Sequence, residues 1–169
     1  EESLSEDDYY QNLPHGVFIG ENVTLLSSYI GIGAHIGDGT SVGPDVVVGY
    51  GVQIGSGVKL FAGAKIGSEK KISLEHIILT AIGNDCEIGA NTAISGIIVE
   101  DGAMIARGVI IDSETEIYDH TTGTTTRGRI PANAVVMAGL PFPDTDKSDN
   151  SVTIIGRRKF DTKKWDSHF

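Results

Sequence analysis

Apolar residues recur every six positions along much of this 169-residue chain. In the first half, the series runs without a break through Ile30, Ile36, Val42, Val48, Ile54, Leu60 and Ile66. A small or β-branched residue follows four positions after each apolar residue up to Leu60, at Ala34, Thr40, Val46, Val52, Val58 and Ala64. The period returns at Ile82, Ile88 and Ile94, and again at Val99, Ile105, Ile111 and Ile117.

A period of six fits neither a helix, whose apolar residues are three and four apart, nor a sandwich strand, in which they alternate. It fits a parallel β-helix, in which each hexad forms one short strand and a corner, and three hexads close a triangular coil. Glycine follows most of the apolar residues, where it permits the torsions of a corner, and β-branched residues suit the flat faces. The sequence therefore predicts an all-β fold, a parallel β-helix of about five coils that stacks equivalent residues about 18 positions apart.

The same pattern divides the chain into three parts. Residues 1–16 are acidic and aperiodic and are predicted to form an N-terminal arm. Residues 17–119 form the predicted β-helix domain, from which residues 68–80, "SEKKISLEHIILT", project as an external loop. Residues 120–169 are predicted to cap the open end of the coil, with a hairpin in the threonine-rich run and a strand in "SVTIIGRRKF".

Composition narrows the functions open to such a fold. The formal net charge of −10 argues against a nucleic-acid binder and against a binder of anionic membranes. No run of about 18 apolar residues occurs and the first residues are acidic, so neither a membrane span nor a signal peptide is expected. The single cysteine, Cys86, occupies a small inward slot and suits a reducing cytoplasm. Five histidines without close pairing argue against zinc, and no metal site is expected.

Two elements that follow the repeats are more specific than the hexads. They are "EIYDHTTG" at 116–123 and "GRIPANAVVMAGLP" at 128–141. With the segments around them, they resemble the tetrahydrodipicolinate N-succinyltransferases over most of the chain. The resemblance implies the left-handed winding of hexapeptide-repeat proteins and a homotrimer of parallel prisms with sites in the grooves between neighbours. It also implies acyl transfer from a co-substrate, succinyl-CoA or another acyl-CoA, to a small-molecule amine, with no bound cofactor.

The chain departs from that family at its two carboxylates. The family's aspartate falls on Gly43 and its glutamate on Ala93, close to a one-residue deletion. Asp45, in "GTSVGPDVVVG", is either a stand-in for the aspartate or a turn residue beside Pro44, and its type and place favour the turn. His76 is the second catalytic candidate, because the external loop that carries it could reach a neighbouring subunit's groove.

The candidate CoA-binding residues are Asn91, Ala106, Arg107, Gly108, Arg129, Ala132 and Arg158. In related transferases the neighbourhood of Asn91 lines the groove, and the backbone of the corner at 106–108 could hold the pantetheine amides. More than half of the 13 Lys and Arg residues lie in the tail, where they fit either CoA phosphates or a solvated charged face. His35 is placed at a corner of its hexad, where a polar residue facing solvent is favoured over a catalytic one.

The sequence therefore predicts a cytoplasmic, acyl-CoA-dependent N-acyltransferase that resembles the tetrahydrodipicolinate N-succinyltransferases. Two alternatives stay open. Because both family carboxylates are missing, the chain could be a catalytically degenerate β-helix that serves binding or assembly. It could also be an amino-sugar acetyltransferase with a replaced acceptor site.

Overall fold

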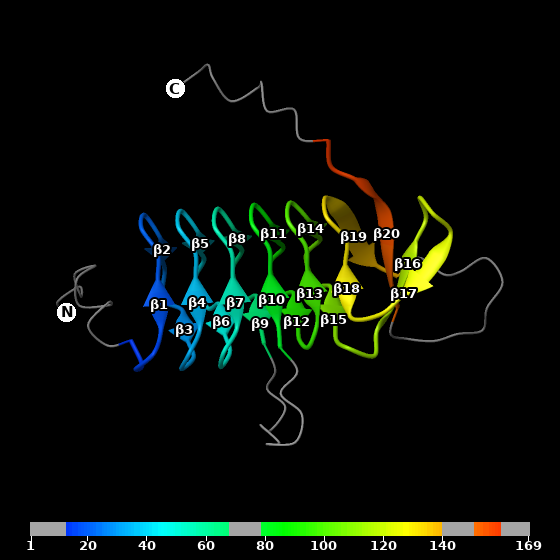
Figure 1. The fold of residues 1–169 in the computed structure, drawn as a ribbon. Helices are drawn as coiled ribbons and strands as arrows, with labels where there is room; N and C mark the ends of the chain where they lie inside the picture. Colours follow the sequence, from blue (N-terminus) through cyan, green and yellow to red (C-terminus); the bar gives the residue numbers. More distant parts are fainter. Residues whose placement is uncertain (1–12, 68–78, 140–150, 160–169) are drawn as a thin grey trace, which may run out of the picture.

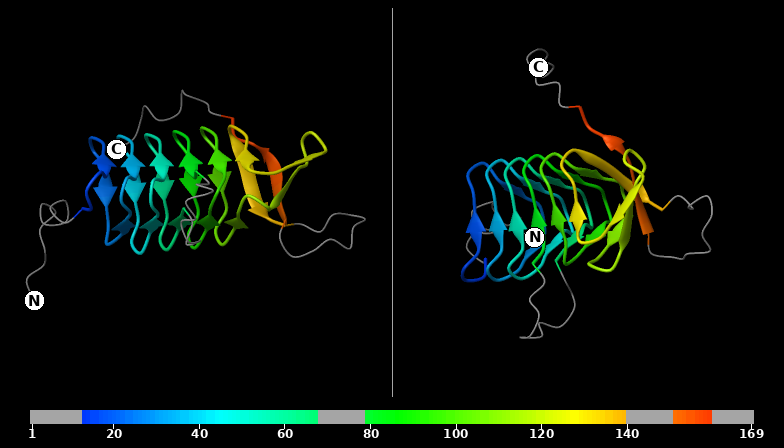
Figure 2. Two further views of the ribbon diagram at one scale, coloured as in Figure 1. Left: turned by 60° about the horizontal axis from the view of Figure 1, so that its bottom comes forward. Right: turned by 45° about the vertical axis from the view of Figure 1, so that its right-hand side comes forward.

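The computed structural model describes residues 13–67, 79–139 and 151–159, and these residues form strands and turns without a helix. Short strands wind around one axis in five triangular coils, with one strand of each coil on each of three faces (Figure 1). The coils stack in chain order, so the prism runs from the N-terminal coil to the C-terminal strands (Figure 2). The predicted parallel β-helix is confirmed. The predicted arm and loop lie largely outside the described residues.

The three faces are three sheets, named A, B and C. Sheet A contains, in spatial order, β1 (Phe18–Ile19), β4 (His35–Ile36), β7 (Gln53–Ile54), β10 (Ala81–Ile82), β13 (Ile98–Val99) and β18 (Arg129–Ile130). Sheet C contains β3 (Tyr29–Ile30), β6 (Val47–Val48), β9 (Lys65–Ile66), β12 (Ala93–Ile94) and β15 (Ile110–Ile111).

Sheet B has the same stack of two-residue strands and continues into the C-terminal strands. Its order is β2 (Thr24–Leu25), β5 (Ser41–Val42), β8 (Lys59–Leu60), β11 (Glu87–Ile88), β14 (Met104–Ile105), β19 (Ala134–Ala138), β20 (Ser151–Arg157), β16 (Glu116–Asp119) and β17 (Thr124–Thr126). Sheet B therefore joins the prism to the cap.

The core is a column of inward side chains stacked coil on coil. In sheet A, Ile36 pairs with Ile54, which lies 18 residues later as predicted. Ile54 pairs next with Ile82, because the external loop adds residues between them, and Ile82 pairs with Val99, which lies 17 residues later. Both predicted series are buried throughout, and Ile36 is 0% exposed. Each such side chain contributes about 1.5–3 kcal/mol relative to an exposed one.

The corners explain two of the residues singled out in the sequence. Asp45 has a φ of +57° and is exposed in the turn between β5 and β6. Asn91 has a φ of +56° in the corresponding turn between β11 and β12. Among residues with a Cβ, Asn and Asp adopt this left-handed region most readily, so the turn itself selects these residue types. The geometry accounts for Asp45 as a turn residue, as its sequence context favours.

At the C-terminal end, the chain leaves the prism and then returns to it. Strands β16 and β17 form the predicted antiparallel hairpin, and β18 then rejoins sheet A by pairing in parallel with β13. Strand β19 pairs in parallel with β14, and β20 lies antiparallel to β19 and parallel to β16. The predicted cap hairpin and C-terminal strand are thus confirmed, and they close the end of sheet B.

An ion pair fixes this closure. Asp119 of β16 is 6% exposed and pairs with the guanidinium of Arg157 in β20. The backbone N and Oγ1 of Thr121 also donate to Asp119 Oδ1, at 2.8 and 2.6 Å. Burial alone would raise the pKa of Asp119, but these donors and Arg157 outweigh it and hold the pKa at about 2. The carboxylate is therefore ionised and locks two strands of the cap together.

Candidate groove on sheet A

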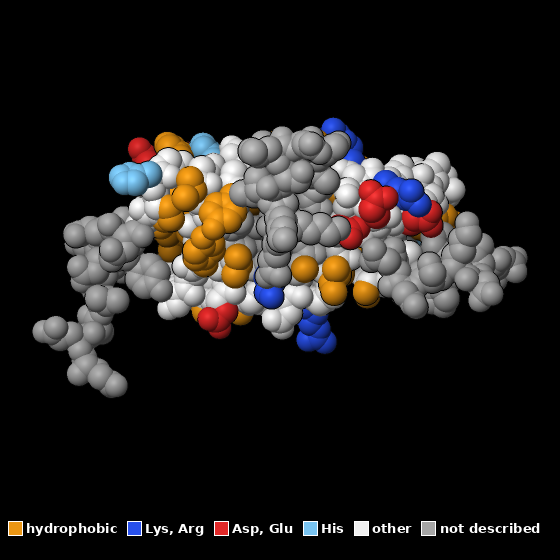
Figure 3. Space-filling view, turned by 90° about the horizontal axis from the view of Figure 1, so that it is seen from below, with side chains coloured by type: hydrophobic (Ala, Val, Ile, Leu, Met, Phe, Trp, Pro, Cys, Tyr) orange, Lys and Arg blue, Asp and Glu red, His pale blue; other side chains and the backbone are white. Residues whose placement is uncertain are grey.

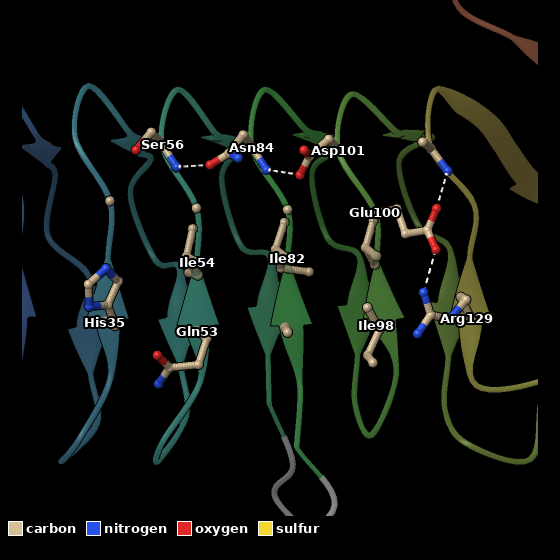
Figure 4. A pocket seen from close by; sticks show the side chains of 16 residues that line it. His35, Gln53, Ile54, Ser56, Ile82, Asn84, Ile98, Glu100, Asp101 and Arg129 are labelled. Carbon is tan, nitrogen blue, oxygen red and sulfur yellow. Dashed lines mark hydrogen bonds and ion pairs between the residues drawn. The ribbon is translucent and has the colours of Figure 1, made fainter.

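A groove of about 670 Å³ follows sheet A and the corner that leads into sheet B (Figure 4). It extends along the prism axis from His35 in β4 to Arg129 in β18. The outward residues of sheet A make its shape, because Ala81 lies in register between Gln53 and Ile98. A methyl side chain between two larger ones leaves the middle of this face hollow.

A ladder of side-chain hydrogen bonds forms the corner of the groove. Asn84 Oδ1 accepts from the backbone N of Ser56 at 2.9 Å, and Asp101 Oδ1 accepts from the backbone N of Asn84 at 2.7 Å. Each side chain reaches back by one coil, as Figure 4 shows. The ladder satisfies corner N–H groups that the strands leave unpaired, and it fixes the polar wall of the groove.

Glu100 binds two groups at the other end of the groove. Its Oε1 pairs with the guanidinium of Arg129, and its Oε2 accepts from the backbone N of Ala132 at 2.9 Å. The hydrogen bond from Arg129, followed by that from Ala132, lowers the pKa of Glu100. Arg129 itself is 57% exposed, so most of its fork of N–H donors still faces the groove or solvent.

His35 lies on a strand face, so its prediction as a corner residue is wrong. It is the first residue of β4, half-buried, and its ring stacks on Phe18 with centroids 4.4 Å apart and planes 10° apart. The residue before an inward residue on these strands points outward, because side chains alternate along a strand. His35 therefore lies on the outer surface of sheet A at one end of the groove.

The groove contains only two of the nine residues predicted for the site, Arg129 and Ala132. Five others belong to the corner between sheets B and C. These five are Asp45, Asn91, Ala106, Arg107 and Gly108. Backbone hydrogen bonds run along this corner from coil to coil, for example from Asn91 N to Ala62 O at 3.0 Å and from Gly108 N to Ala90 O at 2.9 Å. The predicted residues thus lie in two separate rows parallel to the prism axis, one in the groove on sheet A and one, the corner track, between sheets B and C.

Arg158 belongs to neither track. It lies just after β20 against sheet B, where its Nη2 is 3.2 Å from Glu87 Oε1. Lys59 Nζ lies 3.6 Å from the same carboxylate oxygen. His76, the remaining predicted residue, lies outside the described residues. Arg158 therefore holds the cap strand to the prism in this structure.

The positions of the two missing carboxylates are also defined. Ala93 is the outward residue of β12 on sheet C, and Gly43 directly follows β5 at the corner between sheets B and C. A Cβ built on Gly43 would lie 2.9 Å from the carbonyl oxygen of Leu60 in the next coil. An aspartate there would require the backbone to shift. Neither position carries a titratable group.

Sequence reasoning missed Glu100, although a signal for it exists. In the earlier coils, the residue after the inward residue of sheet A is glycine, at Gly20, Gly37, Gly55 and Gly83. Glu100 breaks that column in the fifth coil. Where the repeat prescribes glycine, a long charged residue needs a partner, and Arg129 and Ala132 provide it.

The described part of the chain holds no group of three or more His, Cys, Asp or Glu side chains placed to bind a metal ion. Within the same residues, no helix has the length and apolar character needed to cross a bilayer.

Known families match the repeats, and known proteins match most of the chain. Residues 33–68 match the family described as "Bacterial transferase hexapeptide (six repeats)", and residues 80–113 match "Hexapeptide repeat of succinyl-transferase". Both matched segments consist of hexapeptide repeats. The fold of this chain, the predicted left-handed parallel β-helix, is similar to that of a hexapeptide-repeat acetyltransferase from Vibrio cholerae. The comparison of the two structures gives a TM-score of 0.57. That match has 16% identity and covers 80% of this chain and 77% of the other.

Among curated relatives, the chain is similar to 2,3,4,5-tetrahydropyridine-2,6-dicarboxylate N-succinyltransferases. It is 48% identical over 147 residues to that of Pseudoalteromonas translucida, which is 86% of this chain and 52% of the relative. It is 47% identical over 152 residues to that of Thiobacillus denitrificans, which is 88% of this chain and 53% of the relative. The chain thus spans about half the length of the curated relatives it matches.

Proposed function

We propose that this hexapeptide-repeat protein is an acyl-CoA-dependent N-acyltransferase that acts in the cytoplasm on a small-molecule amine. The observation that carries the proposal is the 47–48% identity to N-succinyltransferases over 86–88% of the chain. This identity is far above the 16% shared with the acetyltransferase from Vibrio cholerae, to which the chain is similar in fold. The identity favours a shared class of reaction, and the proposal leaves the acyl group and the acceptor amine unspecified.

The groove on sheet A is the proposed donor site. Its length along the axis suits an extended thioester arm, and Arg129 at one end is a donor for phosphate oxygens. The backbone N of Ala132 lies beside it, and both groups hold the carboxylate of Glu100, while the remaining N–H groups of the 57% exposed Arg129 are available to a phosphate. The corner track of Asn91 and Arg107 is the proposed contribution to a second subunit's groove.

A homotrimer is part of the proposal, and sheet C is the proposed contact face. Hydrophobic side chains gather over the N-terminal coils on the side shown in Figure 3. On sheet C and its corner, Tyr29, Ile32, Tyr50 and Ile110 are 49–64% exposed. Large exposed apolar residues of this density indicate a contact surface. Light scattering on the purified chain tests the trimer.

Donor binding is the direct test of this function. Isothermal calorimetry and thermal unfolding with succinyl-CoA, acetyl-CoA and free CoA are expected to show binding and a raised melting temperature. Arg129→Ala is expected to weaken binding about tenfold or more, because it removes a charge-assisted phosphate contact. His120→Asn, an exposed change on the cap hairpin, is the matched control. Thiol release with tetrahydropyridine-2,6-dicarboxylate and with amino sugars then identifies the acceptor.

A second function, assembly or ligand binding without catalysis, is favoured by one observation. Gly43 and Ala93 carry no carboxylate at the two positions where the resemblance places them. On this alternative, none of the three CoA compounds changes the melting temperature, while the oligomer persists. Binding of any of them with measurable thiol release excludes it.

A further inference from the structure

N-acyl transfer needs a group that takes the proton of the attacking amine, and the groove offers few. Among the described lining residues, the groups that can change charge are His35, Glu100 and Asp101, besides Arg129. Glu100 is bound by Arg129 and Ala132, and Asp101 accepts the backbone N–H of Asn84. Arginine stays protonated at every working pH. His35 is the remaining group, and imidazole is the side chain suited to proton transfer near neutral pH.

The surroundings of His35 hold its ring in one orientation. Its plane lies against Phe18 of the preceding coil, and Gln53 follows in register on the next coil. Neither neighbour is charged. The acidic residues in the turns that follow β1 and β4 are Glu21 and Asp38, and the backbone N of Glu21 donates to Asp38 Oδ1 at 2.9 Å. Within the described residues, no hydrogen bond engages the imidazole nitrogens, so both edges of the ring are open to a ligand.

The distance from His35 to Arg129 matches an acyl-CoA donor. The register runs from His35 through Gln53, Ala81 and Ile98 to Arg129, which is four coil steps. At about 4.8 Å between neighbouring strands, the two ends are roughly 19 Å apart. The arm between the phosphates and the sulfur of CoA contains two amide units, comparable with about five extended residues, or roughly 17 Å. Phosphates at Arg129 therefore place the thioester beside His35.

We propose that His35 is the general base of the acyl transfer, an inference that rests on the proposed function. The amine nitrogen attacks the thioester carbonyl carbon and forms the C–N bond. His35 takes the proton that this nitrogen loses. The tetrahedral intermediate then collapses, the C–S bond breaks, and the departing sulfur takes the proton back from the imidazolium. Amide and free thiol are the only products, and no further reactant is required.

The first test needs no acceptor. Diethylpyrocarbonate modifies exposed imidazoles, and mass spectrometry of peptides reports each histidine separately. Saturating succinyl-CoA or acetyl-CoA is expected to slow modification of His35 at least fivefold and to leave His120 unchanged. If the donor binds by calorimetry and His35 is modified at its free rate, the inference is overturned while the proposed function stands.

The second test is kinetic and uses His35→Asn, with His120→Asn as the matched control. His35→Asn is expected to lower kcat about 10²–10⁴-fold. Its Kd for the donor should stay within about threefold, and added imidazole should restore part of the rate. Phe18→Ala frees the ring and should lower kcat less, without a change in donor affinity. Acyl transfer at the wild-type rate in His35→Asn overturns the inference alone. Absence of donor binding in the wild type overturns the proposed function and this inference together.

Discussion

The guanidinium of Arg157 pairs with the carboxylate of Asp119 and so ties the last described strand to the strand that begins the cap. This pair joins residues 38 positions apart, and it is nearly buried on the side of Asp119. The cap is therefore held by an interaction that depends on the ionised form of one carboxylate.

Acid should remove the contribution of Asp119 to stability. Its pKa is about 2 in the folded chain against an ordinary value of 3.8. A lowered pKa means that the stabilisation is complete above pH 4 and is lost as the pH falls toward 2. Asp119→Asn is expected to lower the free energy of unfolding by about 2 kcal/mol at pH 7 and by little at pH 2. Urea unfolding at both pH values measures this difference.

Asp45→Asn is the control for that experiment. It changes an exposed carboxylate in a turn where asparagine adopts the same positive φ. Its stability should match that of the wild type at both pH values. An equal loss for the two variants would show that general charge, rather than the buried pair, governs acid unfolding.

The thiol of Cys86 should be inert in the folded protein. It is 0% exposed, and burial raises its pKa to about 11. Its Sγ also lies 3.2 Å from the carbonyl oxygen of Glu100. At pH 8, a thiol reagent such as iodoacetamide is expected to label less than a tenth of the folded chain under conditions that label the urea-unfolded chain fully. Because the chain has a single cysteine, intact-mass spectrometry gives the labelled fraction directly. Rapid labelling of the folded chain would contradict the packed environment described above.

A methyl group at Gly89 should strain two coils. A Cβ there would clash with the backbone N of Arg107 in the next coil. Gly89→Ala is therefore expected to lower the free energy of unfolding by about 1–3 kcal/mol. Gly156→Ala is the matched change, since nothing lies within 4 Å of its built Cβ, and it should stay within about 0.5 kcal/mol of the wild type. Chemical unfolding measures the free energy of unfolding of both variants. An equal decrease in the two would disprove the close approach of the coils at Gly89.

Removal of Glu100 should cost more stability than removal of its arginine partner. Glu100→Ala leaves the N–H of Ala132 without its acceptor, which is expected to cost about 1–3 kcal/mol. Arg129→Ala removes only an exposed ion pair and should cost less than about 1 kcal/mol. Glu100→Gln keeps an acceptor oxygen and should fall between them. Thermal unfolding ranks the stability of the three variants. A larger loss of stability for Arg129→Ala than for Glu100→Ala would show that the ion pair, and not the hydrogen bond from Ala132, is the main contribution of Glu100.

The candidate site was only partly visible in the sequence. Arg129 and Ala132 were singled out through the resemblance, and both lie in the groove. The resemblance and the basic tail also point to Arg158, yet it binds Glu87 on another face. The sequence pattern places His35 at a corner, whereas it is the first residue of β4 on sheet A. Charge and spacing do not report which neighbour a long side chain reaches, since the partner can lie one coil or a whole cap away.

The six-residue period by itself determined the stacked coils and the buried series, and together with the residue type of Asp45 it determined that this residue lies in a turn. It could do so because each hexad must turn one apolar residue inward, and each corner tolerates few residue types. The tertiary structure decided which of three faces each outward residue occupies, since the period repeats identically on all three. It also decided that Glu100 reaches forward to Ala132 and that His35 stacks on Phe18. These contacts join separate coils, and they exist only because the coils stack in one fixed register.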